Sequence, residues 1–180
     1  MATTLVAPYD LALMLGTEAT DPLVTAACHR ASGAFIGAIG YDPSRAVREF
    51  ALTARKYDTL MLPAAPLNEL LGFVDRATGE DLEYAYFDVD SATITRPRGV
   101  RWPARWKAIL VTADTGFDEI PYDIVDAVME RAVILYNSPD PTISQVSEGS
   151  RSYSTAIRSL TGVTQKWSDA VEHYRRIVVD

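Results

Sequence analysis

The side chains best able to hold a metal ion lie in the middle of the sequence. Five acidic residues fall within one short stretch: Glu80, Asp81, Glu83, Asp88 and Asp90. Carboxylate oxygens two positions apart in a turn can converge on Ca²⁺ or Mg²⁺. The calcium-loop pattern is not completed, because Ala92 and Thr93 occupy its later positions. We therefore favour a solvated β-turn, and keep a small metal-dependent or hydrolytic enzyme that uses Asp88 and Asp90 as the alternative.

Other groups with catalytic potential lack the partners that they would need. His29 and His173 fall on different predicted helices, and the single Cys28 excludes both an internal disulfide and a cysteine-based zinc site. Three serines lie in a polar stretch without a nucleophile elbow or a paired base: Ser147, Ser150 and Ser152. We predict no catalytic, cofactor-binding or metal-binding residue, and a protein that is not an enzyme.

One cluster combines basic and aromatic side chains. Its members are Arg96, Arg98, Arg101, Trp102, Arg105, Trp106 and Lys107. Such a set could stack on bases and contact phosphates, or it could anchor a protein interface, where Trp and Arg are favoured. Arginine stems could also simply cover a sheet edge. We favour the protein interface over nucleic acid, because two prolines stiffen the segment and the chain as a whole is acidic.

The elements that position these residues predict an α+β fold that is mainly helical. Pro and Gly signals bound helices at 8–15 and 21–40, which form an N-terminal pair within 1–40. Short alternating runs over 49–120 predict an antiparallel β insert. A third, long helix follows at 121–137, and a closing helix lies at 161–180. Between them 138–160 is a polar loop whose serines, prolines and glycine indicate an extended loop or an edge hairpin rather than a helix.

Two of these helices have apolar residues suited to contacts with another chain. On the third helix Val133 and Ile134 widen the apolar face beyond what a surface helix needs, which indicates either a deep core or a neighbouring subunit. On the closing helix Trp167 could anchor a partner or pack inside its own subunit, and we slightly favour the partner. Arg175 and Arg176 in the expected last turn complement the helix dipole.

Composition limits the class of protein. The chain has 180 residues, 48% of them hydrophobic and 23% charged, which predicts a single folded domain over 1–180. A net charge of -7 argues against a protein whose main task is to bind nucleic-acid phosphates. The first residues lack the basic flank of a signal peptide, and no apolar stretch is long enough to span a bilayer.

The order of elements resembles the head-tail connector (adaptor) proteins of long-tailed bacteriophages. The likeness is carried by 111–124 (VTADTGFDEIPYDI) before an apolar helix that ends at 135–137, and by the Ser/Gly loop at 146–154. The N-terminal helix pair, the sheet segment at 62–67, the basic turn at 96–99 and the closing 174–176 (YRR) are similar in kind and order. The four predicted helices speak against the shorter, β-rich tail-completion proteins.

This resemblance implies a structural virion protein that forms a ring of about twelve copies beneath the portal. The ring joins the DNA-filled head to the tail or stopper and extends the DNA channel without sequence-specific binding. Its location is the virion neck, and the host cytoplasm during assembly, with no membrane contact. We expect contacts between copies or with the portal from Val128, Ala132, Val133, Ile134, Arg98, Arg101, Trp102, Trp167, Tyr174, Arg175 and Arg176.

Overall fold

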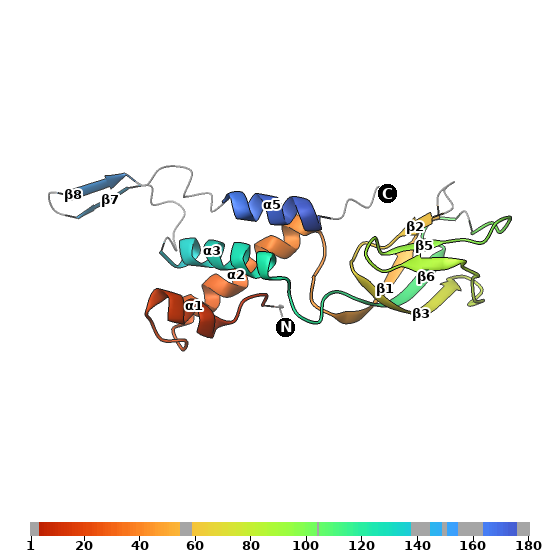
Figure 1. Cartoon of the computed structure of the whole chain (residues 1–180), viewed down its shortest axis with the longest axis horizontal. Coiled ribbons are helices and arrows are strands. Elements are labelled where there is room, and N and C mark those ends of the chain that lie inside the picture. Colours follow the sequence, from red (N-terminus) through yellow and green to blue (C-terminus); the bar gives the residue numbers. More distant parts are fainter. Residues whose placement is uncertain are drawn as a thin grey trace. The chain divides into compact units, whose positions relative to one another are not determined.

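The computed structural model describes residues 4–54, 59–103, 105–137, 145–148, 151–154 and 164–175. The chain divides into two compact units (Figure 1). The helical unit comprises the described parts of Met1–Ile39 and Ile120–Arg175, and the strand unit is built from Gly40–Glu119. The chain thus leaves the helical unit after Ile39, builds the strand unit and returns at Ile120. The expectation that 1–180 fold as a single domain stays a prediction.

The described part of the helical unit holds helices α1 (Pro8–Leu15), α2 (Pro22–Ile39), α3 (Tyr122–Asn137) and α5 (Gln165–Tyr174). Local chemistry sets their ends. Gly16 ends α1 in a left-handed conformation (φ 68°) that glycine adopts without strain. The Asp21 carboxylate accepts a hydrogen bond from Leu23 N at 2.8 Å at the start of α2, and Thr164 Oγ1 caps α5 by accepting one from Trp167 N at 3.2 Å.

The core of the helical unit forms where α3 packs against α1, α2 and α5. Val24 and Phe35 of α2 and Ile124 and Val128 of α3 are fully buried there. Across the surface of the same bundle, Lys166 Nζ of α5 lies 2.7 Å from an Asp126 carboxylate oxygen of α3 and 2.9 Å from one of Glu130. Buried apolar area supplies most of the stability, since exposed ion pairs contribute little.

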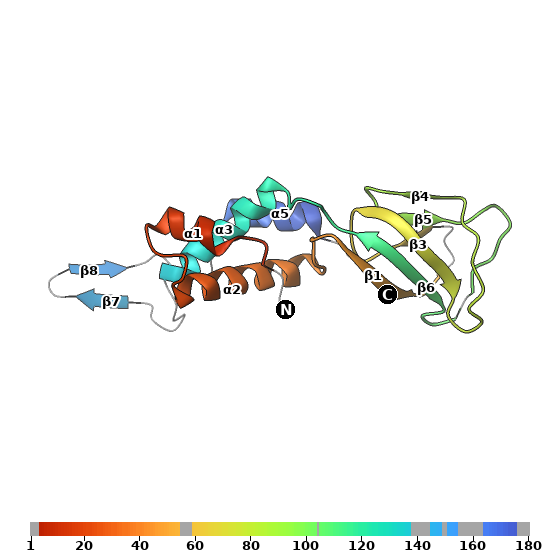
Figure 2. The ribbon, with the colours of Figure 1, turned by 90° about the horizontal axis from the view of Figure 1, so that it is seen from below.

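Two three-stranded antiparallel sheets make up the strand unit. The larger has the order β1 (Ala46–Leu52), β6 (Ile109–Thr115) and β3 (Leu67–Asp75), which run side by side in Figure 2. The smaller has the order β2 (Thr59–Met61), β5 (Thr93–Thr95) and β4 (Tyr86–Asp88). Central strands β6 and β5 bring Val111 and Ile94 into one buried apolar cluster, whose other members include Leu62, Leu67, Phe73, Trp102 and Ile109.

A third pairing lies in the segment expected to be a polar loop. Strands β7 (Gln145–Glu148) and β8 (Arg151–Ser154) pair antiparallel, with Ser147 opposite Ser152. The serine-rich composition had allowed an extended loop or an edge hairpin, and the described residues form the hairpin. The rest of 138–160 lies outside the described residues.

The α+β class is confirmed, but the description "mainly helical" is wrong. All the named elements between Gly40 and Glu119 are strands, and the hairpin adds two more. The physical reason is that the apolar runs of the insert are short and alternate with polar residues, so each contributes one strand to a shared core. The closing helix is also shorter than expected, since α5 ends at Tyr174 and Arg175 is its extended C-cap. None of the described helices has both the length and the apolar character needed to cross a bilayer.

Candidate assembly surfaces

The apolar face of α3, expected to meet a neighbouring subunit, is largely occupied within its own helical unit. Val128 and Ala132 are fully buried, and Val133 and Ile134 are half-buried. Three other helices surround α3, and this accounts for an apolar face wider than one neighbouring helix would require. Contacts of Val133 and Ile134 with another copy stay a prediction, because part of each side chain remains accessible.

Trp167 also lies inside the helical unit. It is 7% exposed, and its ring meets Phe35 edge-on with centroids 5.2 Å apart. The Arg131 guanidinium lies 5.2 Å from the centroid of the Trp167 ring, in cation–π range. This environment favours the second possibility left open by the sequence, that Trp167 packs in its own subunit. It leaves little of the ring for a partner.

Other predicted contact residues of the closing helix lie nearer the surface. Tyr174 is half-buried, and its hydroxyl donates a hydrogen bond of 3.0 Å to an Asp123 carboxylate oxygen. Arg175 is exposed, whereas Arg176 lies outside the described residues. The two histidines are exposed as well, His29 on α2 and His173 on α5.

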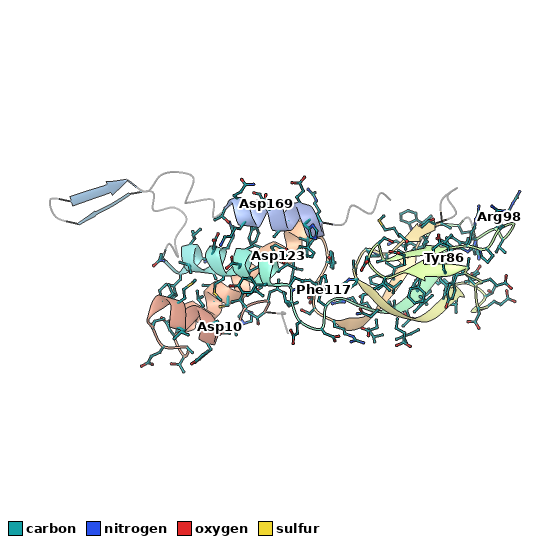
Figure 3. The ribbon with its side chains drawn as sticks, in the orientation of Figure 1. Asp10, Tyr86, Arg98, Phe117, Asp123 and Asp169 are labelled. Carbon is teal, nitrogen blue, oxygen red and sulfur yellow. The ribbon has the colours of Figure 1, made fainter. Side chains whose placement is uncertain are left out.

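The basic and aromatic cluster of the sequence separates into a buried part and an exposed part. Trp102 is 6% exposed and meets Phe73 edge-on at 5.7 Å between centroids, so it belongs to the core of the strand unit. Trp106 is 68% exposed. Arg98 and Arg101 are exposed too, and Arg98 reaches out from its loop in Figure 3. The exposed residues remain candidates for contacts with another protein.

Arg105 of the same cluster is committed to a structural contact. Its Nη2 atom lies 2.7 and 2.9 Å from the two carboxylate oxygens of Asp75. Asp75 also accepts a 2.8 Å hydrogen bond from Ala77 N, which is the main cause of its lowered pKa. Burial of the carboxyl group opposes this shift, and Arg105 reinforces it. The pair thus joins the end of β3 to the segment before β6.

The acidic stretch builds a turn, as the sequence favoured. Asp88 Oδ1 accepts hydrogen bonds from the Ser91 hydroxyl at 2.5 Å and from Ser91 N at 2.7 Å, and these bonds lower the pKa of Asp88. In the part of the chain that the structure describes, no three His, Cys, Asp or Glu side chains gather in an arrangement that could hold a metal ion. No observation therefore supports the alternative of a metal-dependent enzyme.

Sequence reasoning missed a network of arginine contacts in the strand unit, which joins the start of β1 to the end of β6 and the turn after it. Arg45 lies 2.6 Å from an Asp114 carboxylate oxygen and 2.7 Å from one of Asp118, and these contacts raise the pKa of Arg45. Arg48 donates to Thr115 O and Thr115 Oγ1 at 2.9 Å each. Arg45 and its partners are 69 and 73 positions apart, and only a strand register could have paired them.

Exposed apolar residues of α1 were missed as well. Tyr9, Leu13 and Met14 are 67%, 73% and 64% exposed, although the same short helix buries Leu11 and Ala12. The available signal was that PYDLALML is apolar around most of its circumference. A helix of this kind is normally covered on all sides.

Solved structures of particle necks share the fold described above. A chain of the neck of a native GTA (gene transfer agent) particle, computed with C12 symmetry, superposes with a TM-score of 0.56 at 17% identity. The match covers 96% of this chain and 90% of that one. The chain shares its fold with particle neck chains. The resemblance to connector proteins is thus confirmed at the level of the fold.

A second neck structure agrees. A chain from the neck of an empty GTA particle, computed with C6 symmetry, has a TM-score of 0.55 at 19% identity, covering 91% of this chain and 82% of that one. No protein-family model and no curated protein sequence matches the chain.

Proposed function

We propose that this protein is a structural component of a virion neck, a connector that joins the portal of a DNA-filled head to a tail or stopper. The observation that carries the proposal is the shared fold over 96% of the chain with the neck of a particle. The likeness spans both the helical unit and the strand unit, and so goes beyond a common helical motif. Because one fold can host several functions, assembly of the protein itself must decide the role.

The assembly is a ring of about twelve copies. The two matched necks were computed with C12 and C6 symmetry, and both symmetries fit a closed ring with the same contact repeated around an axis. Such a ring needs a heterologous contact, in which two different surfaces of one copy meet their counterparts on its two neighbours. The ring surrounds the channel through which genomic DNA passes without sequence-specific binding.

The protein has no enzymatic role in this proposal. Its partners are other copies of itself, the portal on one side and a stopper or tail-completion protein on the other. It is made in the host cytoplasm and ends in the neck of the virion. Arg98, Arg101, Trp106 and Arg175 are exposed side chains suited to contacts with these partners, because Arg and Trp are favoured at protein interfaces.

The test is assembly of the purified full-length protein, alone and with the portal. We expect a monomer or weakly associated species at low concentration, and rings at high concentration or on portal rings. Native mass spectrometry across a concentration series gives the copy number, and co-sedimentation with DNA-filled, tailless heads shows attachment. A stable dimer that neither concentration nor portal changes would contradict the proposal.

A further inference from the structure

The outer face of α1 is apolar, and none of the described helices packs over it. It consists of Tyr9, Leu13 and Met14 with Asp10 among them, and all four side chains are exposed. At about 100° per residue, these positions follow one another around the side of the helix opposite Leu11 and Ala12. Three large apolar side chains on one eight-residue helix present an unusually bulky surface to water.

The outer face of α2, in contrast to the bulky face of α1, carries small residues. Ala26, Gly33 and Gly37 lie along its centre, and all are exposed. A Cβ atom added at Gly33 or Gly37 would meet no atom within 4 Å. Each glycine destabilises the helix by roughly 0.5–1 kcal/mol relative to alanine. Nothing within the described part of the chain requires this loss at either position, and close approach of another chain would account for both glycines.

The α2 face lies on the side of the helix away from its own core. Ala26 is nine positions from the buried Phe35, which corresponds to half a turn around the axis. Ser32, on the inner side, accepts a 3.0 Å hydrogen bond from Leu5 N near the start of α1. The outer faces of α1 and α2 are therefore separate surfaces of one helical unit, as a head-to-tail contact requires.

Charge makes the two faces complementary. Asp10 is the acidic residue of the α1 face and is labelled in Figure 3. His29 and Arg30, both exposed, flank the small residues of the α2 face. Arg131 adds positive charge near Arg30: burial is the main cause of the lowered pKa of Arg131, and repulsion between the two guanidinium groups lowers this pKa further. An acidic, bulky helix suits this basic, flat surface.

We propose that the outer face of α1 in one copy docks on the outer face of α2 in a second copy, with Asp10 facing Arg30. Repeated around an axis, this contact closes the ring, so it rests on the function proposed above. Tyr9, Leu13 and Met14 supply the bulk, and the glycines let the partner helix approach closely. A second copy is the occupant because one chain carries both complementary surfaces.

Substitution at Gly37 separates assembly from folding. Gly37→Leu fills open space on a helix surface, so we expect a melting temperature equal to or above that of the wild type. The concentration needed for rings should rise about tenfold or more, because the side chain blocks close approach. Glu172→Leu is the matched control, since it adds the same side chain to an exposed position of α5 and should leave assembly unchanged.

Charge reversal tests the orientation of the contact. Asp10→Arg and Arg30→Asp should each weaken assembly, and the double variant should recover at least part of the loss. Recovery in the double variant would not follow if the two residues only affected folding. Sedimentation velocity over a concentration series measures all three variants.

Disulfide cross-linking keeps the proposal falsifiable if a variant folds poorly. Leu13→Cys protein mixed with Gly37→Cys protein should give mixed disulfide dimers on oxidation, whereas neither variant alone should cross-link comparably. The native Cys28 is fully buried, which limits its background reaction. Glu172→Cys in place of Gly37→Cys is the control, and it should give no mixed dimer with Leu13→Cys.

The outcomes distinguish this contact from the proposed function. Wild-type rings that persist in Gly37→Leu and lack the Leu13–Gly37 cross-link would overturn the contact and leave the connector function standing. A wild type that forms no ring at any concentration or on the portal would overturn the ring, and the contact with it. Capture of the α1 face by portal rather than by a second copy would also overturn the proposal.

Discussion

Trp167 of α5 packs against side chains of both α2 and α3, so it should contribute strongly to the stability of the helical unit. Trp167→Ala removes a ring that contacts Phe35 and Arg131, so we expect the free energy of unfolding to fall by about 3–5 kcal/mol. Trp106→Ala is the control, because Trp106 is 68% exposed and its removal should change stability by about 0.5 kcal/mol or less. Urea unfolding compares the two. Unchanged stability with loss of portal binding would instead make Trp167 a partner anchor.

Asp75 is expected to make stability depend on pH. Its pKa in the folded protein is lowered from 3.8, mainly by the Ala77 N–H and with help from Arg105. A lowered pKa means that the stabilisation is fully present above the unfolded value and is lost as the pH falls through the folded value. Asp75→Asn should therefore destabilise the protein at pH 7 and make less difference near pH 3. Urea unfolding at both pH values measures this.

The control for Asp75→Asn is Asp81→Asn, since the Asp81 side chain is exposed and has no ion pair among the described contacts. It should leave the free energy of unfolding nearly the same at pH 7. If Asp75→Asn lost equal stability at both pH values, the contribution of Asp75 would come from packing and not from its charge.

At the scale of elements, Gly116 allows the turn after β6 to lie close against the backbone just before β1. This residue has φ of 101°, and a Cβ atom there would collide with the backbone of Ser44 and come within 2.8 Å of Pro43 O. Gly116→Ala should therefore destabilise the protein by roughly 3 kcal/mol, combining backbone strain with the collision. Thermal unfolding measured by circular dichroism tests this expectation.

Gly79 provides a matched comparison for Gly116. It also has positive φ, at 74°, but a Cβ atom would meet nothing within 4 Å. Gly79→Ala should cost only the strain of about 1–2 kcal/mol. Equal losses in the two variants would show that the crossing at Ser44 relaxes easily and that the close approach has no energetic importance.

The sequence predicted elements better than it predicted their surroundings. The helix over 8–15 was correct to the residue, because Pro8 and Gly16 mark its ends through local backbone chemistry. The wide apolar face of α3 was also evident from the sequence, but the sequence did not show which neighbours cover it. Whether Val133 and Ile134 meet α1, α2 and α5 or another copy depends on tertiary packing, which local periodicity does not specify.

The candidate contact residues show the same limit. Trp102 and Trp106 are close neighbours in the sequence, yet one is buried and the other exposed. Likewise the pairing of Arg45 with Asp114 arises from the β1–β6 register, in which Ala46 lies opposite Thr115. Such contacts require knowledge of the register, and a single sequence gives no direct signal for pairs so far apart.

At the scale of the whole molecule, net charge bears on the role proposed above. Each copy carries a net charge of -7, and the proposed ring would repeat this charge around its axis. Because like charge repels duplex phosphates, a channel of this kind would let DNA pass without retaining it. The exposed Arg98 and Arg101 are the local exception, because the cluster from 96 to 107 holds five basic residues and no acidic ones.

We therefore expect the full-length protein, as a monomer or as a ring, not to bind duplex DNA at about 0.15 M salt, where charges more than roughly 8 Å apart are largely screened. Fluorescence anisotropy with a labelled duplex of mixed sequence tests this across a salt series. Binding that weakens steeply with salt and disappears in the Arg98→Glu, Arg101→Glu double variant would contradict the expectation and identify this loop as a phosphate-binding surface. The same double variant, examined with portal rings, then shows what the loop contacts. If the loop meets a protein partner, attachment should weaken while DNA binding stays undetectable, because substitution of exposed arginines acts on the interface and not on the fold.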